Sequence, residues 1–364
     1  MYRTMHTIGT LGLCLMTACS SDASDPTGPQ AAFAKGQQAT PPIVVMTRNM
    51  YVGADVDRVI LALAGGGENP ADALINAMTE LYITDLPTRI GAIANEIASS
   101  RPTVVALQEV SAYSIDLTLL GGPGPVTGDF LTGLQGALLL KGLDYDVVSN
   151  LNFNFTGIGG LPITLADSDV LLVDARLDVL GTSHGTFPCP LCVPVPNLGN
   201  LMRGWVRADA RIAGKNVTFV GTHPESGADP AIAGLRAYQM QALVASLPTG
   251  NPVILMGDLN DTPGSPMYGV LQAAGFVDAW ASRNPGTTGN TCCYDPNLLT
   301  GSLVKRIDYI MVRGGFLDGT GRVIGGARLS LVGATAAEKV SGGPAGPIWP
   351  SDHAGIVASF PPAR

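Results

Sequence analysis

The sequence is poor in charged residues, and basic residues are the rarer kind. Only 14% of its 364 residues are charged, and 21 Lys and Arg stand against 29 Asp and Glu. The formal net charge of -8 gives no electrostatic attraction to nucleic acid, which proteins bind largely by neutralising phosphates with Lys and Arg. A catalytic metal ion can supply positive charge locally, so this composition does not exclude an enzyme that cleaves nucleic acid.

Signatures of several other enzyme classes are also absent. There is no G-x-S-x-G elbow for a serine nucleophile, and "LAGGGENP" lacks the Lys and Ser/Thr of a phosphate-binding loop. "CPLC" has no partner pair at the same spacing, which disfavours a zinc site. Outside the N-terminus, no apolar run is long enough to span a bilayer.

The first 19 residues have the form of an export signal. Arg3 lies in a short polar start, residues 8–16 are apolar, and small residues follow. The end at Cys19 resembles a bacterial lipobox, in which the Cys becomes the lipid-modified first residue, although Met16 stands where Leu is usual. We expect a lipoprotein signal over 1–19 and an extracytoplasmic protein that is anchored to the outer face of a membrane through Cys19. An ordinary cleaved signal, with a secreted product, is the alternative.

A linker and one domain are expected after the signal. Residues 20–42 are rich in Ser, Asp, Ala, Gln, Gly and Pro and cannot bury enough apolar surface to offset their chain entropy, which predicts a flexible linker. From residue 43 to 361, strand-like and helix-like runs alternate without a further linker, which predicts a single domain. Helices are expected near Leu86–Ser100 and Pro230–Leu247, and we expect a monomer.

Four cysteines remain in the mature chain: Cys189, Cys192, Cys292 and Cys293. An exported compartment permits disulfides, and four cysteines allow three pairings. We expect a loop-stapling disulfide that joins Cys189 or Cys192 to the 292–293 pair.

Polar residues stand repeatedly where an apolar strand ends or begins. In "NPVILMGDLND" four apolar residues lead into Asp258 and Asn260. The others are Asn49 after "PIVVM", Gln108 and Glu109 after "TVVAL", His223 after "VTFVGT", Asp308 before "YIMV", and Asp352 and His353 before "GIVASF". Each alone is explained by a turn or a solvated charge. Strand ends that meet at one sheet edge would gather the whole set in one cleft, and we favour that interpretation.

The residue types in this set indicate a hard cation. Mg²⁺ takes oxygen ligands and keeps several waters, so one or two carboxylates suffice beside a substrate phosphate. Glu109 is the best candidate ligand, with Asn49 and one of Asp308, Asp258 or Asp352 around it. Two histidines with carboxylates and amides around one cation fit metal-assisted phosphoester hydrolysis.

In this order, "QE", "GTHPES", "GDLN", "RIDY" and "SDHAGI" resemble the endonuclease/exonuclease/phosphatase superfamily, over residues 43 to about 360. The resemblance implies a four-layered α/β sandwich of two mixed β-sheets flanked by helices. It also implies a Mg²⁺ ion, or Mn²⁺ or Ca²⁺ in its place, that is held by Glu109 with help from Asn49 and with Asp352 nearby.

The resemblance also implies catalytic roles. Asp258 and Asn260 would hold the scissile phosphate and orient the attacking water. His353, oriented by Asp308, would be the general base. His223 would stabilise or protonate the leaving oxygen, because imidazoles titrate near neutrality.

The substrate stays open between nucleic acid and a phospholipid head group, as in deoxyribonuclease-like and sphingomyelinase-like enzymes. Ser111 and Ala112 follow "QEV" where deoxyribonucleases often carry Arg, which weakens the case for DNA. The segments 69–87 and 185–205 look like insertions, and such loops usually set substrate choice. The second contains apolar residues that we expect to pack on the domain rather than meet a lipid: Phe187, Leu191, Val193, Val195 and Trp205. A phosphomonoesterase for soluble sugar phosphates and a catalytically silent binding module are the alternatives.

Overall fold

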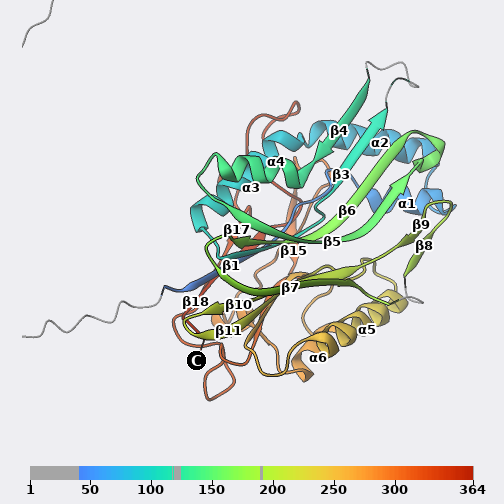
Figure 1. Cartoon of the computed structure of the whole chain (residues 1–364). Coiled ribbons are helices and arrows are strands. Elements are labelled where there is room, and N and C mark those ends of the chain that lie inside the picture. The colour runs from blue at the N-terminus through green and yellow to red at the C-terminus, as the bar shows by residue number, and fades with distance from the viewer. Residues whose placement is uncertain (1–40, 117, 119–123, 189–191, 364) are drawn as a thin grey trace, which may run out of the picture. The chain divides into compact units, whose positions relative to one another are not determined.

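The computed structural model describes residues 41–116, 118, 124–188 and 192–363. The expected signal over 1–19, nearly all of the expected linker, Cys189 and Leu191 lie outside these residues. In the described part, two mixed sheets pack face to face and helices cover the outer face of each (Figure 1). This arrangement confirms the predicted four-layered α/β sandwich. No helix within the described ranges is long and apolar enough to cross a membrane.

The first sheet has eight strands, and β5 pairs with β6 beside the main path β17-β18-β1-β2-β6-β3-β4. These strands are β1 (Ile43–Asn49), β2 (Val104–Gln108), β3 (Ala112–Asp116), β4 (Pro125–Asp129), β5 (Tyr145–Thr156), β6 (Ile163–Asp174), β17 (Arg328–Val332) and β18 (Gly355–Phe360). The second sheet has six strands in the order β13-β16-β12-β11-β10-β7. They are β7 (Asp178–Thr186), β10 (Gly204–Ile212), β11 (Lys215–Thr222), β12 (Val253–Asp258), β13 (Val277–Asp278) and β16 (Asp308–Arg313).

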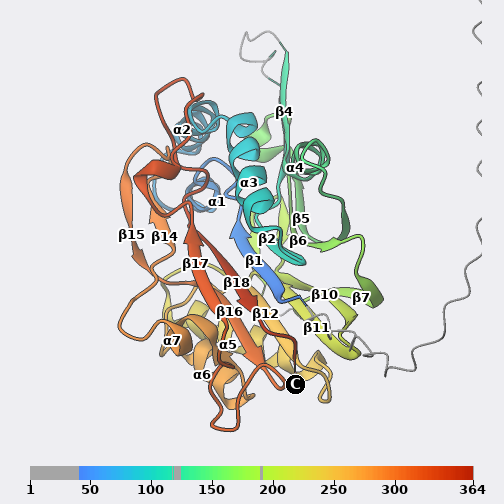
Figure 2. The same cartoon turned by 90° about the vertical axis from the view of Figure 1, so that its left-hand side faces the viewer.

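Two small hairpins lie outside the two sheets. One pairs β8 (Val193–Val195) with β9 (Gly199–Leu201), and the other pairs β14 (Cys292–Tyr294) with β15 (Gly301–Lys305). Figure 2 shows the β14–β15 hairpin at one side of the sandwich.

The helices divide between the two outer layers. The first sheet is covered by α1 (Val56–Leu63), α2 (Pro70–Ile83), α3 (Leu86–Ser100) and α4 (Phe130–Leu139). The second is covered by α5 (Pro230–Ser246) and α6 (Pro266–Ala273), and the short α7 (Ala279–Arg283) follows β13. The helix predicted over Leu86–Ser100 is confirmed, and the second predicted helix ends one residue early, at Ser246.

Strand periodicity explains why the sheets are covered on both faces. In β2, Val104 and Ala106 belong to the core between the sheets, whereas Val105 and Leu107 belong to the core under the helices. Successive side chains of a strand point to opposite faces, so an uninterrupted apolar run requires apolar partners on both sides. The run Val253–Met256 of β12 divides in the same way between the inter-sheet core and the α5–α6 core.

The strand directions bring polar strand ends from both sheets to one place. In the first sheet β1 and β2 are parallel, with Asn49 beside Gln108. In the second sheet β11 and β12 are parallel, and β16 runs antiparallel to β12, so that Asp258 faces Asp308. The residues that follow β1, β2, β11 and β12 therefore meet at a single edge of the sandwich.

Candidate active site

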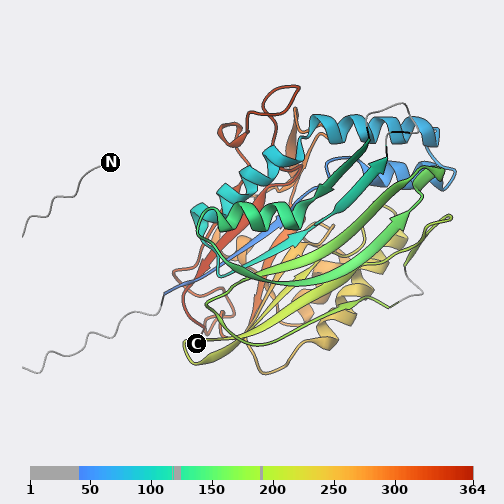
Figure 3. The ribbon, with the colours of Figure 1, turned by 45° about the horizontal axis from the view of Figure 1, so that its top comes forward.

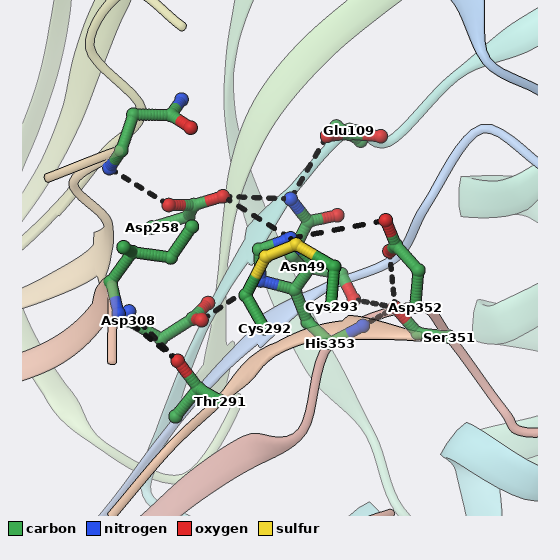
Figure 4. The surroundings of a disulfide bond; sticks show 12 residues. Asn49, Glu109, Asp258, Thr291, Cys292, Cys293, Asp308, Ser351, Asp352 and His353 are labelled. Carbon is green, nitrogen blue, oxygen red and sulfur yellow. Dashed lines mark hydrogen bonds and ion pairs between the residues drawn. A yellow bond between two sulfur atoms is a disulfide. The ribbon is translucent and has the colours of Figure 1, made fainter. Parts of the chain in front are cut away.

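One pocket of about 300 Å³ lies at this edge and collects the predicted residues. Its lining includes Glu109, His223, Asp258, Asn260, Asp352 and His353. Asn49 and Asp308 stand directly behind them, because Asn49 is hydrogen-bonded to Glu109 and Asp308 to His353. The structure thus brings all eight predicted site residues together. Figure 4 labels Asn49, Glu109, Asp258, Asp308, Asp352 and His353.

Asn49 links the two sheets at the base of the pocket. Its Nδ2 donates to Glu109 Oε1 at 2.9 Å and to Asp258 Oδ2 at 3.1 Å. Its Oδ1 accepts from the backbone N–H of Tyr51 at 2.8 Å. With both amide protons in use, Asn49 aligns the carboxylates of Glu109 and Asp258, which come from different sheets.

The loop after β1 closes the other side of Glu109. The backbone N–H of Val52 donates to Glu109 Oε2 at 3.1 Å. Arg89 of α3 is fully buried and donates to the carbonyl oxygens of Met50 at 2.8 Å and Tyr51 at 2.9 Å, which fixes this loop. Glu109 itself has a φ of 54°, a conformation that is uncommon for residues other than glycine and recurs at functional sites.

Asp258, Asn260 and His223 form the part of the site that the second sheet supplies. Asp258 Oδ1 accepts from the backbone N–H of Asn260 at 2.9 Å, and Asn260 Nδ2 lies 3.0 Å from His223 Nε2. The strands β11 and β12 lie very close together here, because a Cβ at Gly257 of β12 would collide with the carbonyl oxygen of Thr222 of β11. The glycine of "GDLN" thus lets His223 lie beside Asp258.

His353 and Asp308 form a buried pair. His353 Nδ1 lies 2.8 Å from Asp308 Oδ2, and the two side chains are 6% and 0% exposed. The opposite ring nitrogen, Nε2, faces the pocket, 3.7 Å from Asp258 Oδ2 and 4.0 Å from Asp352 Oδ2. Arg306 is a cationic neighbour of Asp308 in the sequence, but its Nη1 donates to Asp278 Oδ2 at 2.6 Å and not to Asp308.

Backbone contacts hold this pair in place. Ser351 Oγ donates to the carbonyl of Asn49 at 2.8 Å and accepts from the N–H of His353 at 3.2 Å. Arg48, which is bound to Glu96 in two places, also donates to the carbonyl oxygen of His353. The backbone of His353 is therefore fixed to β1, and its ring is fixed to Asp308.

The carboxylates of the pocket stand in an environment that disfavours their charge. Burial, together with the charge of Asp352, raises the pKa of Glu109 to about 8. Burial and the charge of Asp308 raise the pKa of Asp258 to about 6. Burial also raises the pKa of Asp352. A cation bound beside these groups would favour their charged forms and so would counter the shifts.

This electrostatic situation fits a hard divalent cation between Glu109 and Asp352. Both are oxygen donors, Asn49 Oδ1 retains a second lone pair, and the pocket offers no imidazole–thiolate set that a softer metal would require. The described residues also include a compact group of Asp258, Asp308 and His353 whose ligand atoms lie within 4.8 Å of one another. In this group, Nδ1 of His353 is already bound to Asp308.

The two histidines have opposite electrostatic surroundings. Burial, the charge of Arg203 and the neighbouring His353 hold the pKa of His223 well below its ordinary value. Burial by itself would lower the pKa of His353, but Asp308, Asp352 and Asp258 outweigh it and raise that pKa well above its ordinary value. His223 is thus neutral near pH 7, and both of its ring nitrogens face N–H donors, Arg203 Nη1 at 3.3 Å and Asn260 Nδ2 at 3.0 Å.

Sequence reasoning missed five charged residues of the pocket: Asp55, Asp57, Asp167, Arg203 and Lys305. Two of them, Arg203 and Asp167, are buried. Arg203 stands in the inserted segment 185–205 and lines the pocket, 7% exposed and paired with Glu225 at 3.3 Å. Asp167 of β6 also lines it and accepts hydrogen bonds from Ser111 at 2.9 Å and Asn152 at 3.1 Å. Neither stands at the end of an apolar run, so the pattern that identified the other residues could not find them.

The expected disulfide pairing is wrong. Cys292 and Cys293 are bonded to each other, so neither is available to Cys189 or Cys192. The bonded pair lines the pocket, with Cys293 Sγ 3.9 Å from His353 Nε2 (Figure 4). Two backbone contacts hold the pair there. Cys292 and His353 form an antiparallel β-bridge, and the backbone N–H of Ala354 donates to the carbonyl oxygen of Thr291 at 2.7 Å.

The apolar residues of segment 185–205 pack on the domain where the structure describes their side chains. Phe187 is 4% exposed in the α5–α6 core, with Trp205 against the same cluster, and Val195 is 2% exposed in the core under α1–α4. The other inserted segment, 69–87, forms all of α2 and the start of α3.

Comparisons with known proteins agree with this geometry. A sequence model of the Endonuclease/Exonuclease/phosphatase family matches residues 66–353. No curated protein is a significant match. Three solved structures of similar fold have 15–20% sequence identity to this chain, at which level the likeness shows the fold alone.

The first is an endonuclease/exonuclease/phosphatase from Beutenbergia cavernae DSM 12333, 20% identical, with a TM-score of 0.57, covering 88% of this chain and 72% of that one. The second is a humanized D. rerio TDP2, 15% identical, with a TM-score of 0.51, covering 88% of this chain and 98% of that one. The third is a mannosyl-6-phosphatase from Bacteroides thetaiotaomicron VPI-5482, 15% identical, with a TM-score of 0.52, covering 87% of this chain and 98% of that one.

Proposed function

Because the chain belongs to the endonuclease/exonuclease/phosphatase family, whose members are in general phosphoesterases that use divalent metal ions, we propose that it hydrolyses phosphodiester bonds with such an ion, Mg²⁺ foremost. The observation that carries the proposal is the buried Asp308–His353 pair, with Nε2 of His353 turned into a pocket lined by Glu109 and Asp258. A base with an oriented ring beside a site for phosphate is what hydrolysis by water requires.

In the reaction, the oxygen of water forms a bond to phosphorus and one phosphorus–oxygen ester bond breaks, giving a phosphomonoester and an alcohol. Nε2 of neutral His353 takes the proton of the attacking water, while Asp308 accepts a hydrogen bond from Nδ1–H and stabilises the imidazolium that forms. The leaving oxygen takes up a proton from solvent. A cation beside Asp352 would offset part of the negative charge that raises the pKa of His353 and so would favour the neutral base. The 3.7 Å between Nε2 and Asp258 Oδ2 is too long for a direct hydrogen bond and suits a bridging water. A cation held by Glu109 and Asp352 would neutralise charge on the phosphate and polarise it.

Asn260 and His223 act on the oxygens of the phosphate. One Asn260 amide proton is used by the carbonyl of Pro224 at 3.1 Å, and the other points at His223 Nε2. In this structure the ring of a neutral His223 holds this amide, and a hydrogen bond from either group to an oxygen of the phosphate would replace that contact. Its depressed pKa argues against a role as a cationic acid in the resting enzyme.

The charge of the pocket favours a diester over a monoester. Its described lining includes the carboxylates Asp55, Asp57, Glu109, Asp167, Asp258 and Asp352, and the cationic side chains Arg203 and Lys305. Arg203 is already paired with Glu225. A phosphodiester carries one negative charge, whereas a monoester carries up to two, so the monoester meets the stronger repulsion. The same acidity disfavours nucleic acid relative to a lipid head group.

We further propose that the enzyme is extracytoplasmic and reaches its substrate from the outer face of a membrane, to which a lipid on Cys19 anchors it. The lipobox-like "TAC" and the polar linker up to residue 42 support this location.

Release of p-nitrophenol from bis-p-nitrophenyl phosphate tests the proposal. We expect release with Mg²⁺, loss of release with EDTA, and recovery on adding Mg²⁺, Mn²⁺ or Ca²⁺. A panel of plasmid DNA, RNA, sphingomyelin, phosphatidylcholine and a soluble sugar phosphate then ranks the substrate classes. A purified, folded protein that releases nothing with any of the three cations would favour a silent binding module instead.

A further inference from the structure

An apolar slot opens beside the catalytic pocket, between the helices α1 and α2 and the strands β3, β5 and β6. Its volume is about 60 Å³, and all of its lining residues are apolar except Thr164. Leu63 of α1, Ala77 and Met78 of α2 and Phe155 of β5 are among them. Figures 1 and 3 show α1 and α2 side by side near the ends of these strands.

The slot adjoins the catalytic pocket. Val52, Ala54, Val56 and Ile60 line both cavities. The backbone N–H of Val52 is the group that donates to Glu109 Oε2, so the slot begins next to the carboxylate that we assign to the cation. A molecule whose phosphate lies against Glu109 would need to pass only these shared residues to extend an apolar part into the slot.

The size and chemistry of the slot select what can enter it. With about 60 Å³ against about 300 Å³ for the catalytic pocket, it suits a single alkyl chain and not a nucleobase or sugar. A base or sugar would also leave its polar groups unpaired, because the walls offer almost no hydrogen-bonding partner. Apolar cavities of this kind stay dry and take up apolar molecules.

Three large apolar side chains are exposed on the outer surface of the same two helices, among polar and charged residues. Ile75 and Tyr82 are 59% and 72% exposed and stand seven residues apart, on one side of α2, and Leu61 of α1 is 55% exposed. Large exposed apolar groups beside a ligand site are typical of contact with a membrane or another apolar surface. They favour a chain that is presented by a bilayer.

Resting on the phosphodiesterase function above, we propose that the apolar slot binds an alkyl chain of a phospholipid substrate whose phosphate occupies the catalytic pocket. The carboxylate surplus of that pocket, which includes Asp55 and Asp57, complements a head group that carries a positive charge. Phosphatidylcholine is accordingly the lipid used as the probe.

Binding without turnover is the first test. Alkylphosphocholines with six, eight and ten carbons are titrated in EDTA, each below its critical micelle concentration. Each methylene that enters the slot tightens binding by about fourfold. Ala77→Phe fills the slot and abolishes this dependence on chain length. Ala71→Phe adds the same ring to an exposed position of α2 outside the slot, and it should leave the dependence on chain length unchanged. Ala77→Val serves as a smaller filling if Ala77→Phe does not fold.

Turnover is the second test. In wild type we expect hydrolysis of both phosphatidylcholine vesicles and bis-p-nitrophenyl phosphate, with Mg²⁺ present. Ala77→Phe should lower the ratio of lipid to small-diester turnover at least tenfold, and Ala71→Phe should leave the ratio unchanged. If the affinity of the wild type for alkylphosphocholines does not depend on chain length, the slot assignment is overturned. It is also overturned if Ala77→Phe lowers the turnover of phosphatidylcholine and of bis-p-nitrophenyl phosphate by the same factor. Chain-length-dependent binding with no turnover of either substrate supports the slot and overturns the phosphodiesterase.

Discussion

Removal of the Asp308 carboxylate should cost nearly as much activity as removal of the imidazole it holds. Asp308 Oδ2 lies 2.8 Å from His353 Nδ1 in a buried pair, so Asp308→Asn keeps the shape but loses the acceptor that fixes the tautomer. General-base catalysis contributes about 10²–10⁴-fold, and loss of an orienting carboxylate has a comparable effect in catalytic triads. At about 1.4 kcal/mol for each factor of ten, either change should raise the activation barrier by about 3–5 kcal/mol.

The assay is a double-mutant cycle on bis-p-nitrophenyl phosphate. Asp308→Asn and His353→Ala should each lower kcat by about 10²–10⁴-fold with smaller changes in KM, and the double variant should fall within about tenfold of the weaker single one. Loss of the charge of Asp308 also lowers the pKa of His353, so any residual activity of Asp308→Asn should extend to lower pH.

The outcome that refutes this reasoning is multiplication of the two losses. A double variant whose loss equals the product of the two single losses, within about 10⁴–10⁸-fold below wild type, would mean that the two residues act independently. His353 would then not be a base oriented by Asp308. His184→Ala is the matched control, because His184 lies on β7, outside the pocket, where its ring contacts Asn150 at 3.3 Å. It should retain full activity, and all variants should show similar thermal unfolding.

Three further expectations follow from individual residues. Glu109→Gln should abolish cation-dependent turnover with little change in thermal unfolding, and activity at the wild-type Mg²⁺ requirement would contradict the assignment of Glu109 as ligand. Because the pKa of His223 is depressed in the fold, the unfolded chain binds its proton first as pH falls, so stability should drop below the ordinary histidine pKa of about 6.5. His223→Gln should remove this loss, which is at most about 2 kcal/mol between pH 7 and pH 5 in urea unfolding. Cys19→Ser should move the protein from the detergent phase to the soluble fraction, and unchanged partitioning would indicate a plain signal peptide.

The gathering of the candidate site residues in one pocket could be predicted because their signal is local. Each stands within a few residues of an apolar run, and a strand places its last residues at the sheet edge whatever the rest of the fold does. The helix Leu86–Ser100 and the strand that ends at Gln108 together place Glu109 in this way. The same short-range logic covers "GDLN", where a glycine is needed for the close approach of Thr222.

Other features of the site depend on contacts between distant segments. Arg203 reaches the pocket because β10 pairs with β11 and carries segment 185–205 toward His223. The Cys292–Cys293 pair lies against His353 because the β14 strand bridges to residue 353, and the pairing of cysteines does not follow from their spacing. The opposite pKa shifts of His223 and His353 arise from charges contributed by several elements.

The sequence by itself therefore determined the layered α/β class, the family and the eight polar residues at the strand ends, because alternation and strand termination are encoded over a few neighbouring residues. The tertiary structure alone decided which cysteines bond, in which direction the pKa of each histidine shifts and where an apolar slot lies beside the pocket that contains Glu109. These properties depend on burial and on distances between side chains that are far apart in the chain, and no local pattern contains them.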